Sequence, residues 1–329
     1  MKTALVTGAA GFVGFHLSRR WLEEGWRIVG LDAMTDYYDT DLKKSRLAEL
    51  DAFPGFEFLE GRVEAPGLLN GLLARHAPAH VLHLAAQAGV RHSIEAPRDY
   101  LSANIAGTFE LLEAARAHPG SQLLIASTSS IYGANTKLPY AESDKADSQV
   151  SFYAASKKAT EAMAHSYAHL YEIPVTLFRF FTVYGPWGRP DMAPMKFTKA
   201  ILEDRPIEVY NHGRMKRDFT YIDDLVEAVW RLAHVPPERG TDAQSAVAPY
   251  RIVNIGKAAP DNLGDFIAEI EKALGKPANK LMKDMQPGDV TATHSDTALL
   301  ESLTGYRCTT PLSEGIPKLI DWYRAYYSA

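Results

Sequence analysis

The 329-residue sequence contains a single cysteine, Cys308. One thiol excludes an intrachain disulfide and any metal site built from several thiolates. No apolar run approaches the roughly 18 residues that a membrane-spanning helix needs. His165 and His169 have the i, i+4 spacing of a metal-ligand pair, but no third ligand is evident nearby. We therefore predict neither a membrane span nor a metal site.

A strong charge of either sign is also missing. The chain has 35 Lys and Arg against 40 Asp and Glu, a net charge of −5 and an isoelectric point near 6.1. Such a balance does not favour a nucleic-acid or anionic-membrane partner. Hydrophobic residues make up 46% and charged residues 23% of the chain, as in packed globular proteins. We see no signal peptide before the first predicted strand, so we expect a cytoplasmic protein.

Short β-prone apolar runs alternate along the chain with helical patterns. The runs are residues 2–7, 27–31, 56–59, 80–84, 122–127 and 175–180, and the main helical stretches are 100–117 and 153–171. This alternation predicts an α/β fold, a Rossmann-type doubly wound parallel sheet. After residue 181, Pro and Gly become frequent and the segments shorten, which predicts a smaller C-terminal lobe that binds substrate. We expect the sheet domain to span 1–181, with 223–256 returning to it, and the lobe to combine 182–222 with 257–329.

Three glycines follow the first predicted strand, in Gly8-Ala-Ala-Gly11-Phe-Val-Gly14. Glycines at a strand-to-helix turn let the backbone approach a pyrophosphate, and the helix N-terminus supplies N–H groups and positive dipole charge. The spacing differs from the usual G-x-G-x-x-G fingerprint. Asp32 ends the second predicted strand, where a carboxylate would bind the adenosine ribose hydroxyls. The pattern predicts a dinucleotide site, and Asp32 favours NAD because it would repel the 2′-phosphate of NADP.

Tyr153 and Lys157 are spaced i, i+4 in a predicted helix and therefore share one of its faces. A lysine ammonium beside a phenol favours the phenolate, which would lower the tyrosine pKa from about 10 toward the range of a general base. A tyrosine base can take a proton from a sugar hydroxyl while hydride leaves the same carbon. The spacing alone is common on surface helices, but beside a dinucleotide loop it indicates redox chemistry on a hydroxyl.

These motifs resemble the extended short-chain dehydrogenase/reductase superfamily, in particular its nucleotide-sugar epimerases and dehydratases. Further segments that carry the resemblance are His83-Leu-Ala-Ala-Gln87, Ser127-Thr-Ser-Ser-Ile-Tyr-Gly133, Arg179-Phe-Phe-Thr-Val-Tyr-Gly-Pro186 and Arg217-Asp-Phe-Thr-Tyr-Ile-Asp-Asp224. The resemblance covers nearly the whole chain. It implies that Tyr153 is the base and acid, that Lys157 tunes it and binds the nicotinamide ribose, and that Thr128 hydrogen-bonds the reacting hydroxyl. Asn104 occupies a position that commonly supports the lysine.

The resemblance also implies a set of NAD-binding residues. They are Gly8, Gly11, Phe12, Val13, Asp32, Arg62, Val63, Ala85, Ala86, Gln87, Tyr153 and Lys157. Arg62 departs from the pattern, because relatives usually have there an aspartate that reads the adenine amino group. An arginine cannot accept that hydrogen bond, but it could stack on the adenine face. The departure leaves NADP open, although Asp32 argues against it.

The residues after Thr128 separate the reactions of this superfamily. Similar dehydratases carry Asp-Glu there, to protonate a leaving hydroxyl, and decarboxylases carry a glutamate nearby. This chain has Ser129-Ser130-Ile131 instead, so elimination lacks its proton donor. We therefore expect C4 epimerisation: hydride leaves C4, the 4-keto sugar turns over, and hydride returns to the other face, with NAD regenerated.

The closest resemblance is to the enzymes that interconvert UDP-glucuronate and UDP-galacturonate, and segments 133–139, 180–192 and 210–213 carry it. Thr182 stands where UDP-glucose 4-epimerases have Asn. Hydroxyls of Thr128, Ser129, Ser130 and Thr182 could clasp the C6 carboxylate and hold it in an orientation that resists loss of CO2 from the 4-keto uronate. The alternatives are UDP-glucose or another nucleotide sugar as substrate and, more remotely, a non-catalytic NAD-binding protein.

The UDP-sugar contacts implied by the resemblance are Arg91, Ser129, Ser130, Thr182, Arg189, Val209, Tyr210, Arg217 and Asp289. Ser130 could instead fill a turn. Arg189 could either close over the substrate carboxylate or bind a nearby backbone carbonyl. Gln286 stands where some relatives have an arginine, so one phosphate contact could be missing. Relatives often dimerise through the helices that correspond to 100–117 and 153–171, and we expect a homodimer.

Overall fold

A computed structural model describes residues 1–240, 245–285 and 290–328. Its centre is a seven-stranded sheet in the order β11-β6-β5-β4-β1-β2-β3, with every neighbouring pair parallel. The strands are β1 (Thr3–Thr7), β2 (Arg27–Asp32), β3 (Phe56–Glu60), β4 (His80–His83), β5 (Gln122–Thr128), β6 (Val175–Phe180) and β11 (Tyr250–Ile255). The order reverses between β1 and β4, which is where doubly wound sheets bind their ligands. All six runs predicted as strands lie in this sheet, so the predicted fold class is confirmed.

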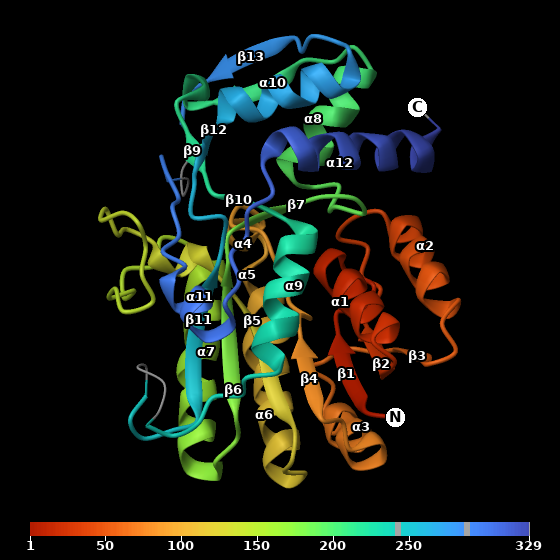
Figure 1. Cartoon of the computed structure of the whole chain (residues 1–329), viewed down its shortest axis with the longest axis vertical. Coiled ribbons are helices and arrows are strands. Elements are labelled where there is room, and N and C mark those ends of the chain that lie inside the picture. Colours follow the sequence, from red (N-terminus) through yellow and green to blue (C-terminus); the bar gives the residue numbers. More distant parts are fainter. Residues whose placement is uncertain (241–244, 286–289, 329) are drawn as a thin grey trace.

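Helices cover both faces of the sheet (Figure 1). They include α1 (Phe12–Glu23), α2 (Thr40–Asp51), α3 (Leu68–His76), α6 (Gly107–Ala117), α7 (Phe152–Tyr171), α9 (Ile222–Ala233) and α11 (Ala298–Thr304). Successive side chains of a strand point to opposite faces. In β1, Ala4 and Val6 accordingly join the core formed with α1 and α9, whereas Leu5 joins the core formed with α3, α6 and α7. Since the parallel strands are covered on both faces, most of their buried residues are apolar, although β6 and β11 also bury Arg179 and Arg251.

A smaller lobe lies at the end of the sheet away from the N-terminus (Figure 1). Its elements are α8 (Ala193–Leu202), β8 (Ile207–Tyr210), β9 (Lys216–Arg217), β12 (Asp261–Asn262), α10 (Leu263–Leu274), β13 (Lys280–Lys283) and α12 (Leu312–Tyr327). Strand β8 pairs with β13 and β9 with β12, while β7 (Thr182–Tyr184) pairs with β10 (Phe219–Tyr221) where the chain leaves the sheet. The exact division into two domains stays a prediction, although β11 returns to the edge of the main sheet beside β6.

One predicted helix is built differently from the expectation. The stretch 100–117 is not continuous α-helix: α4 (His92–Glu95) and α5 (Pro97–Tyr100) lead into a π-helix, η1 (Leu101–Ala106), before α6 begins. Asn104, inside η1, is buried and hydrogen-bonds to segments outside its own helix. Short π-helical turns often occur at functional sites. Two 3₁₀ turns, η2 (Ser129–Tyr132) and η3 (Asn211–Gly213), complete the fold. No helix among the described residues could cross a membrane.

Candidate active site

The glycine turn joins β1 to α1 and needs glycine at two positions. Gly8 has a φ of +75°, and a Cβ on it would lie 2.8 Å from the amide nitrogen of Ala85. A Cβ on Gly14 would lie 2.0 Å from the carbonyl oxygen of Gly8, far inside van der Waals contact. Gly11 precedes α1 and has no side chain to cap it, so the first amide groups of the helix are available to an anion. The turn therefore fits a pyrophosphate.

Asp32 is held at the carboxyl end of β2, next to the glycine turn. Its two carboxylate oxygens accept hydrogen bonds from the amides of Ala10 (3.1 Å) and Met34 (2.9 Å). The carboxylate thus lies where the fold would bring an adenosine ribose. Arg62, which follows β3, is mostly exposed and forms an ion pair of 3.0 Å with Glu64. Its predicted stacking on adenine stays a prediction.

Hydrogen bonds from the π-helix η1 link the segment after β4 to the start of α7. Asn104 accepts a hydrogen bond from the amide of Gln87 (2.8 Å) and donates to the carbonyl of Gln87 (3.1 Å) and to the Ser156 hydroxyl (2.9 Å). Lys157, which follows Ser156, donates to the carbonyl of Ala126 (3.0 Å). Asn104 therefore supports the lysine through its neighbour and not by a direct contact.

Tyr153 and Lys157 lie in the first turns of α7, and Thr128 lies at the end of β5. The helix starts where it does because Ser151 caps it, accepting from the amide of Ala154 (3.1 Å). The ring of Tyr153 packs edge-on against the buried ring of Tyr100, with centroids 6.0 Å apart. The three residues that the sequence predicts to be catalytic are thus all set by regular elements of the sheet domain.

The electrostatics of the pair differ from the expectation. Burial raises the pKa of Tyr153, and the Thr128 hydroxyl and the Arg189 guanidinium counteract this only in part. Burial lowers the pKa of Lys157 to about 8, and the nearby Glu161 carboxylate acts in the opposite direction. The spacing predicts a lowered tyrosine pKa, but the surrounding protein groups raise it, because burial disfavours the charged phenolate.

A cavity of about 160 Å³ collects several predicted substrate residues. It is lined by Val90, Ser129, Ser130, Gly133, Tyr140, Val150, Ser151, Thr182, Arg217, Val290 and Thr293. Four of these were predicted from the sequence: Ser129 and Ser130 in η2, Thr182 in β7 and Arg217 in β9. The Ser130 hydroxyl accepts a hydrogen bond from the Thr128 hydroxyl (3.2 Å). Tyr140 and Thr293 were not predicted, because neither belongs to a motif.

A buried carboxylate next to Arg217 organises one side of this cavity. Asp218 accepts hydrogen bonds from the amides of Lys257 (2.7 Å) and Ala258 (3.1 Å), and from the amide and hydroxyl of Ser295 (3.0 and 2.6 Å). Its own carbonyl accepts from the amide of Thr182 (3.1 Å). Asp218 therefore fixes Arg217 and Thr182 relative to each other.

Two further predicted substrate residues meet across the lobes. The guanidinium of Arg91, which precedes α4, lies over the ring of Tyr210 at the end of β8, 4.9 Å from its centroid. Val209, in the same strand, is buried. Asp289 and Gln286 lie outside the described residues.

Of the two alternatives for Arg189, the bond to a backbone carbonyl is not found in the described structure, where the side chain pairs with a carboxylate instead. Its guanidinium forms a two-bonded ion pair with Asp191 (3.0 and 2.5 Å). It also lies over the ring of Tyr37, 5.9 Å from the centroid. Its predicted contact with substrate stays a prediction.

The loop that carries Arg189 is held by two side chains of the sheet domain. The buried Arg46 of α2 donates to the carbonyls of Ala10 (2.8 Å) in the glycine turn and Trp187 (2.6 Å) in the loop. His16 of α1 hydrogen-bonds the carbonyl of Pro186 (3.0 Å). The dinucleotide turn and the Arg189 loop are therefore connected directly. Neither side chain was predicted, because buried links between distant segments leave no local pattern.

Nothing in the described part of the chain resembles a metal centre: no three His, Cys, Asp or Glu side chains gather there. His165 hydrogen-bonds the Ser245 hydroxyl (3.0 Å) and His169 the carbonyl of Val247 (2.7 Å). The two histidines thus fasten α7 to the segment before β11.

Residues 4–256 match the model of the NAD dependent epimerase/dehydratase family. A "Probable UDP-glucuronate 4-epimerase" of Rhizobium meliloti (strain 1021) is 50% identical, covering 98% of this chain and 97% of the relative. "UDP-glucuronate 4-epimerase 4" of Arabidopsis thaliana is 44% identical, covering 99% of this chain and 76% of the relative. A crystal structure of UDP-glucuronic acid 4-epimerase from Bacillus cereus, in complex with UDP-glucuronic acid and NAD, has a TM-score of 0.88 at 32% identity. That likeness covers 99% of this chain and all of the other.

Proposed function

Because the chain belongs to the NAD dependent epimerase/dehydratase family, we propose that it is a UDP-glucuronate 4-epimerase. It interconverts UDP-glucuronate and UDP-galacturonate by inverting C4 of the sugar. The observation that carries the proposal is the lining of the cavity beside Thr128. Hydroxyls and Arg217 line it, and none of its described lining residues is a carboxylate. Such a site suits an anionic sugar and lacks an acid for elimination.

The catalytic proposal assigns one role to each residue. Bound NAD accepts the hydride from C4 and returns it to the same carbon. Tyr153 takes the proton of the C4 hydroxyl and later gives it back, while Thr128 hydrogen-bonds that oxygen. Lys157 supplies a positive charge that stabilises the phenolate of Tyr153. Because proton and hydride both return, the reaction has no net redox change and needs no second substrate.

The glycine turn and Asp32 fit the cofactor. The open amides at the start of α1 favour the pyrophosphate. The Asp32 carboxylate, already oriented by two amides, suits the two ribose hydroxyls and disfavours a 2′-phosphate. These contacts support NAD as the cofactor.

The hydroxyl-rich lining has a consequence for the intermediate. A 4-keto uronate is a β-keto acid, and it loses CO2 readily when the bond to its carboxylate stands perpendicular to the carbonyl plane. Ser129, Ser130 and Thr182 offer neutral donors that hold the carboxylate in another orientation. Hydrogen bonds to a charged group contribute about 1.5–3 kcal/mol each, enough to restrict its rotation.

Removing one of these hydroxyls is expected to release CO2. Thr182→Ala or Ser129→Ala should increase the fraction of UDP-pentose product, or weaken binding of UDP-glucuronate about tenfold without weakening that of UDP-glucose. Product ratios from proton NMR and KM values for both sugars measure this. Thr198→Ala is the matched control, because that buried hydroxyl bonds only within α8, to the carbonyl of Pro194. Product ratios and substrate preference equal to those of the wild type would show that these hydroxyls do not hold the C6 carboxylate.

The choice of substrate is tested by comparing two UDP-sugars that differ only at C6. We expect kcat/KM for UDP-glucuronate to exceed that for UDP-glucose by about 10- to 100-fold, the value of one hydrogen bond to a carboxylate. A kcat/KM that favours UDP-glucose would reassign the protein to the neutral-sugar epimerases.

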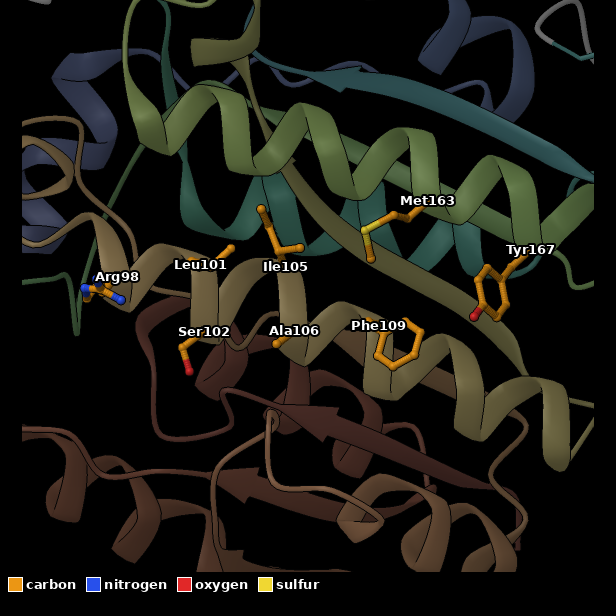
Figure 2. A pocket seen from close by; sticks show the side chains of 8 residues that line it. All are labelled: Arg98, Leu101, Ser102, Ile105, Ala106, Phe109, Met163 and Tyr167. Atoms are coloured by element: carbon orange, nitrogen blue, oxygen red, sulfur yellow. The ribbon is translucent and has the colours of Figure 1, made fainter.

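We also infer a homodimer through an apolar groove on the surface. The groove, of about 560 Å³, lies between η1, α6 and α7 (Figure 2). Its lining residues are Arg98, Leu101, Ser102, Ile105, Ala106, Phe109, Met163 and Tyr167. Leu101 and Phe109 are 49% and 46% exposed, which is costly for large apolar side chains in a monomer. A second copy that presents the same helices would cover both in an isologous contact.

A charge in this groove is expected to separate the protomers. Phe109→Glu should give a monomer at micromolar concentration in sedimentation velocity, because pairing would bury an uncompensated carboxylate. Val247→Glu is the control, since Val247 is 48% exposed and does not line the groove. A monomeric wild type, or a Phe109→Glu variant that stays dimeric, would exclude this interface.

A further inference from the structure

Glu161 is a buried acid one turn beyond Lys157 on α7, and 2% of its side chain is exposed. Each of its carboxylate oxygens accepts a hydrogen bond of 3.0 Å from the guanidinium of Arg179 in β6. One of them also accepts the Ser127 hydroxyl of β5 at 2.8 Å. Glu161 therefore joins the catalytic helix to two neighbouring strands. None of the substrate or cofactor contacts assigned above includes it.

Each of the last three residues of β5 connects to a different part of this arrangement. The carbonyl of Ala126 accepts from Lys157 (3.0 Å), and the hydroxyl of Ser127 donates to Glu161 (2.8 Å). Thr128 follows and hydrogen-bonds Ser130 in the cavity lining. Because side chains alternate along a strand, holding Ser127 from one face orients Thr128 toward the other. The orientation of the Thr128 side chain thus depends on the Glu161 carboxylate.

The polar network continues from Glu161 to the far wall of the cavity. Arg179 lies over the ring of Tyr132, 4.8 Å from its centroid. The Tyr132 hydroxyl donates to Asn254 of β11 (2.7 Å), and Asn254 donates to the carbonyl of Tyr140 (2.8 Å), which lines the cavity. Within this network the Glu161 carboxylate, the Tyr132 hydroxyl and the Asn254 amide are paired, whereas Nη1 of Arg179 has no hydrogen-bond partner. These buried bonds favour one geometry, because another arrangement would leave more polar groups unsatisfied.

Glu161 also affects the pKa of Lys157. His83 of β4 lies close enough to act on Lys157, while Arg179 of β6 and Lys158 of α7 pair with Glu161. The Tyr250 hydroxyl of β11 donates to the backbone carbonyl of Glu161 and also feels the charges of Glu161 and Arg179. Burial lowers the pKa of His83 to about 3, so its ring is neutral at working pH. Burial lowers the pKa of Lys157, and the Glu161 carboxylate is the group that counteracts this effect.

We propose that Glu161 is a positioning residue of the reaction, which fixes Lys157 and Thr128 relative to each other through its bonds to Ser127 and Arg179. The inference rests on the roles that the proposed function gives to those two residues. It adds a residue that contacts neither substrate nor cofactor and acts through the residues that do.

The test is the pH profile of kcat in Glu161→Gln, which keeps the shape of the side chain and removes its charge. Glu161 raises the pKa of Lys157, so its removal lets Lys157 lose its proton at lower pH. The alkaline limb of the profile should therefore move down by about one pH unit, which corresponds to a tenfold change in the lysine equilibrium. At neutral pH we expect kcat to fall about tenfold, while KM changes less than about twofold, because the substrate contacts remain.

Tyr250→Phe is the matched control. It removes a hydrogen bond of 3.1 Å to the backbone carbonyl of Glu161 at the same buried place, and leaves the carboxylate untouched. Its pH profile should superimpose on that of the wild type. An alkaline limb that moves equally in Tyr250→Phe and Glu161→Gln would indicate a general structural effect and would overturn the proposal.

Glu161→Gln leaves Arg179 buried without its carboxylate, which could unfold the protein. The double variant Glu161→Leu with Arg179→Met replaces the whole pair by apolar side chains and avoids this penalty. It should fold, as judged by circular dichroism, and still show the lower kcat and the lower alkaline limb. If it folds with a wild-type profile, the proposal is wrong. Failure of the wild type to convert UDP-glucuronate would instead overturn the proposed function.

Discussion

Phenylalanine in place of Tyr153 is expected to lower kcat by about 10²- to 10⁴-fold, the usual contribution of a general acid–base group. The substitution removes one hydroxyl and keeps the ring, which packs against Tyr100 at 6.0 Å. The fold and the glycine turn should therefore be unaffected. NAD affinity is expected to stay within about threefold, because only one of many cofactor contacts changes.

Steady-state kinetics on UDP-glucuronate and calorimetric NAD binding measure the two quantities. Tyr171→Phe serves as the control, because Tyr171 ends the same helix and is 43% exposed. Its kcat should equal that of the wild type. A Tyr153→Phe enzyme with kcat within twofold of the wild type would mean that another group moves the proton.

Alanine in place of Gly14 is expected to abolish useful NAD binding. The added Cβ would lie 2.0 Å from the carbonyl oxygen of Gly8 and 2.8 Å from its carbonyl carbon. Both contacts are with backbone, so α1 or the turn must move. Overpacking of this kind costs about 1–3 kcal/mol, and a displaced turn also loses its amide contacts, so we expect NAD affinity to fall at least about 100-fold.

The measurement is the NAD dissociation constant together with the thermal unfolding midpoint. Gly71→Ala is the control: it lies inside α3, and a Cβ there meets nothing within 4 Å. Because alanine is the better helix former, this control should be neutral or stabilising by up to about 1 kcal/mol. NAD affinity in Gly14→Ala within threefold of the wild type would show that the turn adapts, contrary to the geometry.

The fold could be predicted because its signals are local. Apolar runs predict six of the seven strands of the sheet, and glycines at fixed offsets predict the turn after β1. Each of these patterns lies within about a dozen residues of sequence. The π-helix η1 could not be predicted in this way. Asn104 owes its conformation to bonds with Gln87 and Ser156, which lie 17 and 52 residues away in the sequence. Sequence periodicity carries no information about such partners.

The candidate site likewise contains residues that local motifs predict and features that depend on distant segments of the chain. Ser129, Ser130, Thr182 and Arg217 could be predicted from motifs, and the structure brings all four to one cavity. The direction of the Tyr153 pKa could not be predicted, because burial raises it by more than the Thr128 hydroxyl and the Arg189 guanidinium lower it. Asp218 belongs to a predicted motif, yet its role as a buried link between Lys257, Ala258 and Ser295 became visible only in the fold.

The central claim is that hydride leaves C4 and returns to it within one enzyme. The most direct measurement follows UDP-glucuronate deuterated at C4 by proton NMR, with the NAD-loaded protein in ordinary water. The account predicts UDP-galacturonate that keeps deuterium at C4, with no net NADH. A proton gained at C4 from solvent, or a UDP-pentose as the main product, would contradict it.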